Sequence, residues 1–405
     1  MTIEKITELP QFPFRRQCPF VEPEIYTQSR VEDPIRKIRM VDGRPAWLLT
    51  RYDDVRAVLN DPRFSSDKTN PEYPAFVIGL REGLDKSERF MVNMDDEEHS
   101  ASRRAVISEF STRRIAALTP HIQQTVDKAV DDLLASPKPA DLIRLVAMPV
   151  PSLLTAALTG VDHTDYALFQ ELTSRSVRHD ISAEERVQFA GELRAYMDAL
   201  VATKVANPGD DLISRQAAQQ RAEHGEVDVA GLSTLAVLLM IAGQETTTET
   251  IALGMLALLS EYEQRAALTS DPRRIPLAVE EILRYFTVLD FGPPRLARED
   301  VEVGGVLIRA GEGVVANIYA ANHDGSVFPD PQEFDLSRPN ARSHVAFGHG
   351  PHQCLGQNLV RQELRIVFET LFRRVPTLRL AVGLEELEFK NQGLIYGIKE
   401  LPVTW

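Results

Sequence analysis

Apolar residues recur every three or four positions over most of the chain, which predicts a mainly helical protein. Residues 113–136 show this spacing most clearly, at Ile115, Leu118, Ile122, Val126, Val130 and Leu133. Similar patterns predict helices over residues 142–159, 184–204 and 229–261. A further amphipathic run, QNLVRQELRIVFETLFRRV, predicts a helix near the C-terminus.

Strand-like patterns are fewer and lie mostly late in the chain. The run AWLLT, residues 46–50, predicts a strand that leads directly into a helix-like YDDVRAVLN. Residues 301–308, with a Gly-Gly in the middle, residues 314–318 and the tail after residue 378 predict the others. The fold class expected is therefore mainly α with a minor β component.

The Pro-rich opening, residues 10–34, is interrupted by prolines, and we expect it to run irregularly over the surface. No repeat and no Gly/Ser-rich linker divides the remainder. The sequence thus predicts one large domain over residues 1–405, with residues 1–34 as an irregular N-terminal segment.

Composition narrows the class of protein without naming an activity. At 405 residues and 43% hydrophobic content, the chain can bury a large core. Its net charge of −14 argues against generic nucleic-acid binding. Two cysteines, Cys18 and Cys354, form no disulfide framework and fit a reducing compartment. The N-terminus has no apolar core of signal-peptide length, so we expect a cytoplasmic protein without a membrane anchor.

The predicted helix 229–261 carries a polar belt. Two nine-residue apolar stretches, 235–243 and 251–259, flank the belt Gln244–Thr250. A membrane span needs about 20 mostly apolar residues, so the belt favours a helix buried in a protein interior. Either the threonines bond back to the helix and bend it, or Gly243, Glu245 and Thr246 open the helix beside a ligand. Ala242 and Thr246 share one face, where small side chains admit a bulky cofactor.

The second chemical signal is a glycine-rich loop that contains Cys354. It reads FGHGPHQCLG over residues 347–356 and directly precedes the last amphipathic helix. Backbone N–H groups and a helix N-terminus favour the thiolate of such a cysteine. Three interpretations stay open from the residues alone. Cys354 is a small buried hydrophobe, a zinc ligand together with His344, His349 and His352, or an axial ligand of haem iron.

The loop and three further motifs resemble the cytochrome P450 superfamily. The pattern F-G-x-G-x-H-x-C-L-G is similar to the superfamily's haem-binding signature, and the residues from Ala242 to Thr247 resemble its oxygen-activating motif. Glu281-x-x-Arg284 resembles the E-x-x-R pair, with Arg338 as its third partner. The resemblance runs from about residue 12 to residue 405 and is strongest to soluble bacterial, actinobacterial-type haem-thiolate monooxygenases.

The resemblance implies a single P450-like domain that holds haem b between the central long helix and the cysteine-loop helix. Cys354 supplies the axial thiolate, and Glu281, Arg284 and Arg338 are structural. His99 and Arg103, in an H-x-x-x-R helix, would meet the haem propionates with Arg295 and His352. The implied cofactor-binding residues are His99, Arg103, Ala242, Gly243, Arg295, Phe347, Gly348, His352, Cys354 and Gly356.

The resemblance also implies the reaction, in which one atom of O2 hydroxylates or epoxidises a hydrophobic small molecule and the other leaves as water. Thr246 resembles the alcohol that holds oxygen and an ordered water, and Glu245 the acid that feeds protons. We find no flavin or nicotinamide fingerprint, so electrons would come from a ferredoxin and its reductase, which Arg103, Arg104 and Arg361 would meet. A polyketide, a terpenoid or steroid, or a xenobiotic would fit as substrate. Its pocket would draw on the stretch from Phe76 to Met91, helices near residues 163–200, Leu239, Gly243, Leu289, Phe291, Leu394 and Ile395.

Several departures and two alternatives accompany this interpretation. Glu245 replaces the commoner aspartate, residues 95–99 read DDEEH where the family has D-P-P-E-H, and Asn322-His323-Asp324 replaces N-R-D. One alternative is a nitric oxide reductase of the same fold that takes hydride directly from NAD(P)H, against which the Glu245–Thr246 pair argues. The other is a zinc-binding helical interaction module built on the His/Cys cluster.

Overall fold

The computed structural model describes residues 9–74, 89–176, 183–289, 291–391 and 393–405. Two compact units share the chain. Unit 1 comprises Met1–Ala101, Pro276–Leu355 and Phe389–Gly397, and unit 2 comprises Ser102–Ile275, Gly356–Glu388 and Ile398–Trp405. The single domain expected over residues 1–405 stays a prediction at this level.

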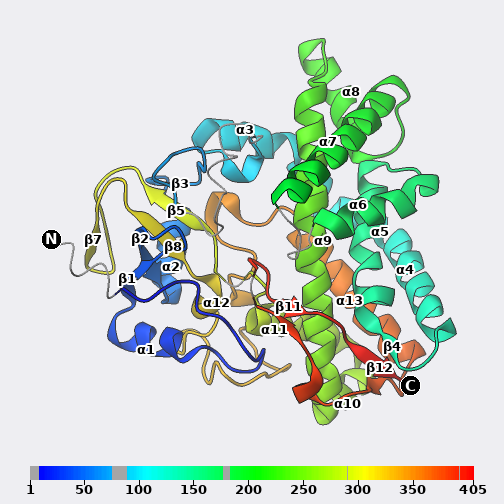
Figure 1. The fold of residues 1–405 in the computed structure, drawn as a ribbon. Helices are drawn as coiled ribbons and strands as arrows, with labels where there is room; N and C mark the ends of the chain where they lie inside the picture. Colours follow the sequence, from blue (N-terminus) through cyan, green and yellow to red (C-terminus); the bar gives the residue numbers. More distant parts are fainter. Residues whose placement is uncertain (1–8, 75–88, 177–182, 290, 392) are drawn as a thin grey trace. The chain divides into compact units, whose positions relative to one another are not determined.

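Unit 1 contains a five-stranded sheet of order β1-β2-β8-β5-β3, shown in blue and yellow in Figure 1. Its strands are β1 (Ile35–Arg39), β2 (Pro45–Leu49), β3 (Phe64–Ser65), β5 (Pro294–Ala297) and β8 (Gly313–Ala316). β2 and β8 are parallel, and the other neighbours are antiparallel. The remaining elements in or entering unit 1 are α1 (Glu24–Glu32), α2 (Tyr52–Asn60), η3 (Met91–Asn93), α3 (Asp96–Val106), α11 (Ile275–Phe286), β6 (Val301–Val303), β7 (Val306–Ile308), α12 (Ile318–Ala321), η8 (Ala341–Ser343), η9 (Gly350–His352), β10 (Phe389–Lys390) and β11 (Gly397–Ile398).

Both faces of this sheet are buried, which explains why its central strands read as continuous apolar runs. On β2, Leu48 packs into one core cluster and Leu49 into another. On β8, Val314 and Val315 divide between the same two clusters. Successive side chains point to opposite faces of a strand, so each central strand supports two cores at once.

Unit 2 is a helical assembly around α9 (Val229–Ser260), the long green helix of Figure 1, against which α5 and α7 pack. Its other elements are η4 (Ile107–Phe110), α4 (Thr112–Ala135), β4 (Ala140–Asp141), the π-helical turn η5 (Ile143–Ala147), α5 (Pro149–Thr159), η6 (His163–Asp165), α6 (Tyr166–Ser176), α7 (Ala183–Ala206), α8 (Leu212–His224), α10 (Tyr262–Ser270), η7 (Pro272–Arg274), α13 (Gln357–Arg374), β9 (Arg379–Leu380), η10 (Leu384–Glu386) and β12 (Pro402–Thr404). β12 pairs with both β4 and β9, so the C-terminal tail is held in a small sheet.

Helix predictions from the periodic segments are confirmed, with shifted ends. The segment 113–136 forms α4, 184–204 forms α7 and 229–261 forms α9. The segment 142–159 divides into η5 and α5, because Pro149 stands at the first position of α5 and has no N–H to continue the preceding turn. The strand expected over 314–318 ends at Ala316, since the Asn317 side chain caps α12 by accepting a bond from the Ala320 N–H.

The prediction for the Pro-rich opening is wrong. Residues 24–32 form α1, which begins directly after Pro23, and the side chains of Phe12, Arg16 and Tyr26 are buried. Proline fixes the backbone angle that a first helical turn needs, so a proline-rich sequence can start a helix as well as interrupt one. Strands β1 and β5 were also missed, since neither IRKIR nor PRLA alternates apolar and polar residues.

Among the described residues, α9 is the one helix long and apolar enough to cross a membrane. Five members of its polar belt are buried: Gln244, Thr247, Thr248, Glu249 and Thr250.

Candidate active site

The loop that carries Cys354 is closed by its own backbone. The Cys354 N–H donates to the Phe347 carbonyl over 2.8 Å, and the Gly348 N–H donates to the Val345 carbonyl over 2.8 Å. Between them, the Gln353 N–H donates to the Gly350 carbonyl and closes the short turn η9. Cys354 itself is half-buried. The loop's own hydrogen bonds therefore fix the position of the Cys354 backbone.

Gly350 is the glycine that the loop cannot replace. Its φ of +71° is a conformation that side chains disfavour, and a Cβ there would lie 2.6 Å from the Leu59 carbonyl at the end of α2. Gly348 has the same φ of +71°, but nothing lies within 4 Å of its Cβ position. Gly348 thus serves the turn alone, whereas Gly350 also allows the backbone of α2 to lie close to the loop.

Three buried charged residues form the brace predicted from the E-x-x-R motif. Arg284 donates from Nε and Nη2 to the two oxygens of Glu281, each over 2.7 Å. Arg338 Nε donates to Glu281 Oε1 over 3.1 Å, and the Asp335 N–H donates to the same oxygen. The remaining donors of both arginines reach carbonyls of residues 322–333. A buried charge needs such complete pairing, because removal of one partner leaves the others unpaired.

Asn322 joins this brace to the cysteine loop. Its carbonyl accepts from Arg284 Nη1 over 2.8 Å, and its side-chain Oδ1 accepts from the Val345 N–H over 2.7 Å. Its Nδ2 donates to Thr287 Oγ1 over 2.8 Å. In the sequence, Asn322 stands out only as part of the N-H-D departure, and no spacing along the chain predicts that it connects the brace to the loop.

His344 gives the loop a second attachment to α11. Its Nε2 lies 3.0 Å from Glu280 Oε2, and its Nδ1 accepts from the Ala346 N–H over 3.1 Å. An Nδ1 that accepts leaves the proton on Nε2, which then donates to Glu280. His344 is therefore engaged in the fold and does not turn toward Cys354 as a shared metal ligand would.

His323 occupies the arginine position of the family's N-R-D pattern without carrying a charge. Its Nδ1 lies 3.0 Å from the Tyr319 carbonyl, and its ring packs on the rings of Tyr319 and Tyr285. Burial, helped by the nearby Arg284 guanidinium, lowers the pKa of His323 well below its usual range. The substitution thus leaves a neutral ring in this part of the core.

The zinc interpretation is wrong. No cluster of three or more His, Cys, Asp or Glu side chains that could hold a metal ion occurs in the part of the chain that the structure describes. His352 lies with Nε2 3.2 Å from Ser66 Oγ and stacks on His99, with ring centroids 3.9 Å apart.

The predicted propionate partners of unit 1 lie in a cationic environment. His99 and His352 stack directly, and Arg295 is buried with Nη1 donating to the Pro294 carbonyl. Burial lowers the pKa of Arg295, and burial together with Arg295 lowers the pKa of Lys68. Neither cation forms an ion pair with a carboxylate of the described residues. A bound dianion would supply that charge, so this environment fits the two propionates of haem.

Lys68 is the member of this group that sequence reasoning missed. It stands in an ordinary-looking FSSDK run with no partner at helical or strand spacing. Only the fold brings it beside Arg295.

Side-chain bonds hold the start of α3, where this chain lacks the prolines of the D-P-P-E-H pattern. Asp95 accepts from Ser65 Oγ over 2.5 Å and from the Ser66 N–H over 2.7 Å. Arg298 pairs with both Asp95 and Asp96, each over 2.7 Å. These bonds tie the start of α3 to β3, in place of the rigidity that prolines would give.

In unit 2, the belt of α9 shows the first alternative, in which threonine hydroxyls bond back to the helix. Thr246 Oγ1 donates back to the Ala242 carbonyl over 2.9 Å, and Thr250 Oγ1 donates to the Thr246 carbonyl over 2.7 Å. The helix is continuous from Val229 to Ser260, so α9 does not open at Gly243, Glu245 and Thr246 as the second alternative expects. Three buried atoms of the belt, Gln244 Oε1, Thr247 Oγ1 and Thr248 Oγ1, have no partner among the described residues.

The same stretch of α9 also presents an open apolar surface. Ile241 is 44% exposed and Ala242 is exposed, although much of the rest of their helix is buried. Glu245 and Thr246 are half-buried beside them. A Cβ on Gly243 would meet Thr155 Oγ1 of α5 at 3.4 Å. An exposed patch of small and apolar residues in a buried helix suits the flat apolar face of a large cofactor.

Comparison with known proteins decides the family. The model of the family "Cytochrome P450" matches residues 197–377. Vitamin D3 dihydroxylase from Streptomyces griseolus is 41% identical over 405 residues, covering 100% of this chain and 99% of that protein. The chain belongs to the cytochrome P450 family. Pentalenic acid synthase from Streptomyces avermitilis is 43% identical over 97% of both chains. The crystal structure of cytochrome P450 MoxA from Nonomuraea recticatena (CYP105) matches with a TM-score of 0.93 and 50% identity, covering 98% of both chains.

Membership of the P450 family confirms the expected fold class, enzyme class and cofactor. The chain is a P450 monooxygenase with a mainly helical fold, and its cofactor is haem with a cysteine thiolate as axial ligand. The cationic residues of unit 1 and the open face of α9 both fit this group.

The predicted substrate residues of this P450 have different environments. Leu289 and Ile395 are joined by an isolated β-bridge in unit 1, whereas Phe291 is buried and Leu394 is 38% exposed. Met91 is buried in η3, and Leu239 and Gly243 are half-buried on α9. Helices α6 and α7 occupy most of the segment 163–200. Phe76 and most of the stretch up to Met91 lie outside the described residues.

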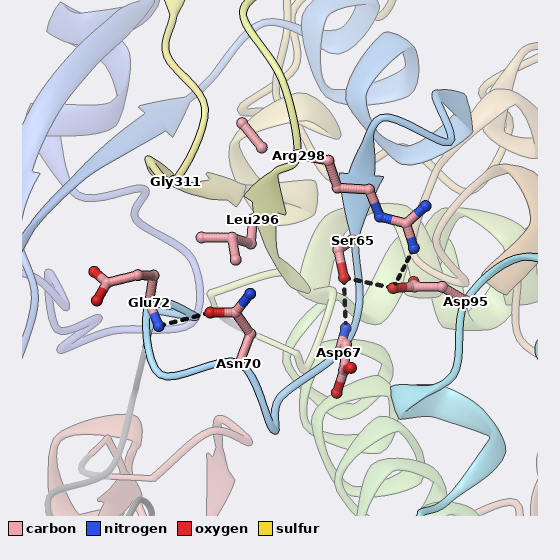
Figure 2. A pocket seen from close by; sticks show the side chains of 9 residues that line it. Ser65, Asp67, Asn70, Glu72, Asp95, Leu296, Arg298 and Gly311 are labelled. Atoms are coloured by element: carbon pink, nitrogen blue, oxygen red, sulfur yellow. Dashed lines mark hydrogen bonds and ion pairs between the residues drawn. The ribbon is translucent and has the colours of Figure 1, made fainter.

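A separate pocket of about 370 Å3 lies wholly in unit 1 (Figure 2). Its polar lining includes the carboxylates of Asp67, Glu72 and Asp95 and the guanidinium of Arg298, which pairs with Asp95. None of the predicted substrate residues that the structure describes lines it. Its charged lining does not suit the hydrophobic substrate that the sequence analysis expects.

Proposed function

We propose that this P450 hydroxylates or epoxidises a hydrophobic small molecule in the cytoplasm, with Cys354 as the axial ligand of its haem and an external ferredoxin as electron donor. The observation that carries the proposal is the cysteine loop, which closed backbone bonds and a buried ionic brace hold in one conformation. A metal ligand needs such a fixed position, because a small displacement of a reacting group costs much of the rate.

When bound, haem supplies the activation of dioxygen, while the protein's residues bind, orient and deliver protons. Backbone N–H groups of the glycine-rich turn and the start of α13, three residues after Cys354, favour a thiolate over a thiol. His99, Arg295 and His352, with Arg103 and Lys68, would hold the propionates by charge and hydrogen bonds. Ala242, Gly243, Phe347, Gly348 and Gly356 would border the ring.

Thr246 and Glu245 would deliver protons to the haem site. The reaction consumes two electrons and two protons for each oxygen atom inserted, with one water released. Thr246 Oγ1 now donates to the Ala242 carbonyl, so rotation of one side-chain torsion frees that donor for oxygen or water. Glu245 is half-buried on the adjacent position and can exchange its proton with solvent.

The substrate would be an extended or polycyclic apolar molecule. The named relatives act on vitamin D3 or make pentalenic acid, and the residues assigned to the pocket here are mostly apolar. A terpenoid or steroid therefore fits this chain well, and a polyketide or a xenobiotic is a further hydrophobic candidate.

The electron donor would be a small acidic ferredoxin with its reductase. Arg103 and Arg104 on α3 and Arg361 on α13 offer positive charge in a chain whose net charge is −14. Electrostatic attraction of this kind raises association rates and weakens with salt.

One reconstitution tests the proposed function. The purified holoenzyme, an iron–sulfur ferredoxin, its reductase and NADPH would oxidise a steroid or sesquiterpene panel, with one oxygen atom from labelled O2 in each product. Substrate binding would first be read from displacement of iron-bound water in the haem spectrum. Rapid consumption of nitric oxide with NADH and no redox partner would instead support the nitric oxide reductase.

Replacement of Thr246 tests the proton assignment. Thr246→Ala would retain haem but divert reducing equivalents to hydrogen peroxide, because no hydroxyl would orient the distal water. Thr250→Ala is a matched control, since that hydroxyl donates to the Thr246 carbonyl on the same helix. An unchanged ratio of product to NADPH in Thr246→Ala would move the role to another group.

A further inference from the structure

Arg16 is a charged side chain with no exposed surface, in the N-terminal segment of unit 1. Its guanidinium carbon lies 4.1 Å from the centroid of the Tyr319 ring and 3.9 Å from that of the Tyr396 ring. Its Nη1 donates to the Phe286 carbonyl over 2.8 Å. The group is thus held between two aromatic faces, at the C-terminal end of α11, where the helix favours a positive charge.

The partners of Arg16 adjoin two segments that the proposed function assigns to the substrate pocket. Phe286 ends α11, shortly before Leu289. The Tyr396 N–H donates to the Val288 carbonyl over 2.8 Å, and Ile395 forms a β-bridge with Leu289. The ring of Tyr396 is therefore one residue from a pocket residue, and its backbone pairs with the segment that carries another.

A second contact from the N-terminal segment fixes Phe291. The Phe12 ring meets the Phe291 ring edge-on, with centroids 5.5 Å apart. The next residue, Gly292, has a φ of +68°, and a Cβ there would lie 1.9 Å from the Ala316 carbonyl. Phe291 thus packs on Phe12 and is followed by a backbone that touches the end of β8.

These contacts make the N-terminal segment a support for both assigned substrate segments. A planar guanidinium between two rings resists rotation of either ring, which an alkyl contact or a lysine ammonium would not do. We infer that Arg16 is a positioning residue for substrate specificity, which fixes the Leu289 and Ile395 segments at the distance that selects substrates by length. The inference rests on the proposed function, since that function assigns these segments to the pocket.

Arg30 provides a matched control in the same N-terminal segment. It is also buried, but its guanidinium forms an ion pair with Glu22 instead of lying over aromatic rings. A general loss of packing in this part of unit 1 would follow from replacing either arginine. A change in substrate selection would follow only from replacing Arg16.

The experiment measures selectivity rather than activity. Holoenzymes of the native sequence, Arg16→Lys, Arg16→Gln, Tyr396→Leu, Arg30→Gln and Leu289→Ala would be titrated with N-methyl-, N-butyl- and N-octylimidazole. The imidazole nitrogen binds the iron, the chain samples the pocket, and the haem spectrum reports the dissociation constant. Thermal unfolding would record the stability of each variant. Arg16→Lys keeps the charge and is the variant least disruptive to folding.

We expect the octyl-to-methyl affinity ratio to change about fivefold or more in both Arg16 variants and in Tyr396→Leu, because apolar pockets discriminate by chain length on this scale. Arg30→Gln would keep the native ratio even where its unfolding temperature falls. Native ratios in Arg16→Lys, Arg16→Gln and Tyr396→Leu, alongside a changed ratio in Leu289→Ala, would overturn the role of Arg16. A native ratio in Leu289→Ala as well would overturn the assignment of Leu289 to the pocket, on which the inference rests. The proposed function would fail separately if the holoenzyme of the native sequence did not show the thiolate-type carbon monoxide spectrum.

Discussion

Buried polar groups beside the cysteine loop and buried polar groups on the helices of unit 2 have opposite surroundings. Around the loop, Glu281, Arg284, Arg338 and Asn322 satisfy one another and nearby carbonyls. On α9 and α13, Gln244 Oε1, Thr247 Oγ1 and Glu363 Oε2 are buried without a hydrogen-bond partner among the described residues. Unpaired buried polar groups cost about 1–3 kcal/mol each, so we expect the two regions to differ in stability.

The difference indicates two kinds of requirement. A loop that presents an axial ligand needs one conformation, and fully paired charges provide it. A helix beside a large cofactor and moving protons gains from polar atoms that stay available, since water or ligand can then satisfy them. Five pairs of substitutions test this contrast.

The largest effect is expected at Cys354. Cys354→Ala removes the axial thiolate but none of the charged groups of the brace, so the fold should persist while the thiolate-type spectrum of the reduced carbon monoxide complex disappears. Cys18→Ala is the matched control and should keep that spectrum. An unchanged spectrum in Cys354→Ala would refute the ligand assignment.

Breaking the brace should cost the most stability. Glu281→Gln leaves Arg284 and Arg338 buried with uncompensated charge, and such losses cost about 3–5 kcal/mol. The free energy of unfolding in urea would record the loss, together with faster release of haem. Glu388→Gln, which removes an exposed partner of Lys399, should leave unfolding nearly unchanged. Equal effects of both substitutions would contradict the role of the brace.

Replacing Glu363 should have a pH-dependent effect, and at high pH it should stabilise the protein, whereas Glu281→Gln destabilises it. Burial raises the pKa of its carboxyl from 4.5 to about 8, so the folded state binds a proton more tightly than the unfolded state does. Stability from this group is therefore lost as pH rises between those two values. Glu363→Gln should be about 4 kcal/mol more stable, relative to the native sequence, at pH 8.5 than at pH 4.5. Glu369→Gln, on the half-buried face of α13, is the matched control, and an equal pH dependence of both variants would contradict the role of burial at Glu363.

The two loop glycines should respond differently to alanine. Gly350→Ala brings both the strained φ and a contact with the Leu59 carbonyl, and we expect a loss of about 2–3 kcal/mol. Gly348→Ala brings only the strained φ and should cost about 1 kcal/mol. Thermal unfolding of the two holoenzymes gives the order, and a reversed order would contradict the packing of the loop on α2.

The smallest effect is expected on α9. Thr247→Val removes a buried hydroxyl that has no partner among the described residues, so unfolding should change by less than about 1 kcal/mol or become less favourable. Thr159→Val, on α5, removes a buried hydroxyl that donates to the Thr155 and Ala156 carbonyls, and it should destabilise. A larger loss from Thr247→Val would show that an ordered partner satisfies its hydroxyl.

The sequence alone determined the features that depend on local order along the chain. Helical periodicity predicted α4, α7, α9 and α13, because a helix repeats every 3.6 residues and its buried side must be apolar. The cysteine loop and the E-x-x-R pair were also predictable from local sequence, because the residues of each motif lie within a few positions of one another. These short motifs also predicted the family.

The tertiary structure decided what depends on residues far apart in the chain. Asn322 reaches Val345 and Arg284, Lys68 lies beside Arg295, and Arg16 lies between Tyr319 and Tyr396, yet no local pattern marks any of them. The Pro-rich opening was predicted as surface and is partly core for the same reason. Burial of an arginine or an asparagine becomes favourable only when distant segments supply its partners, and only the folded chain supplies them.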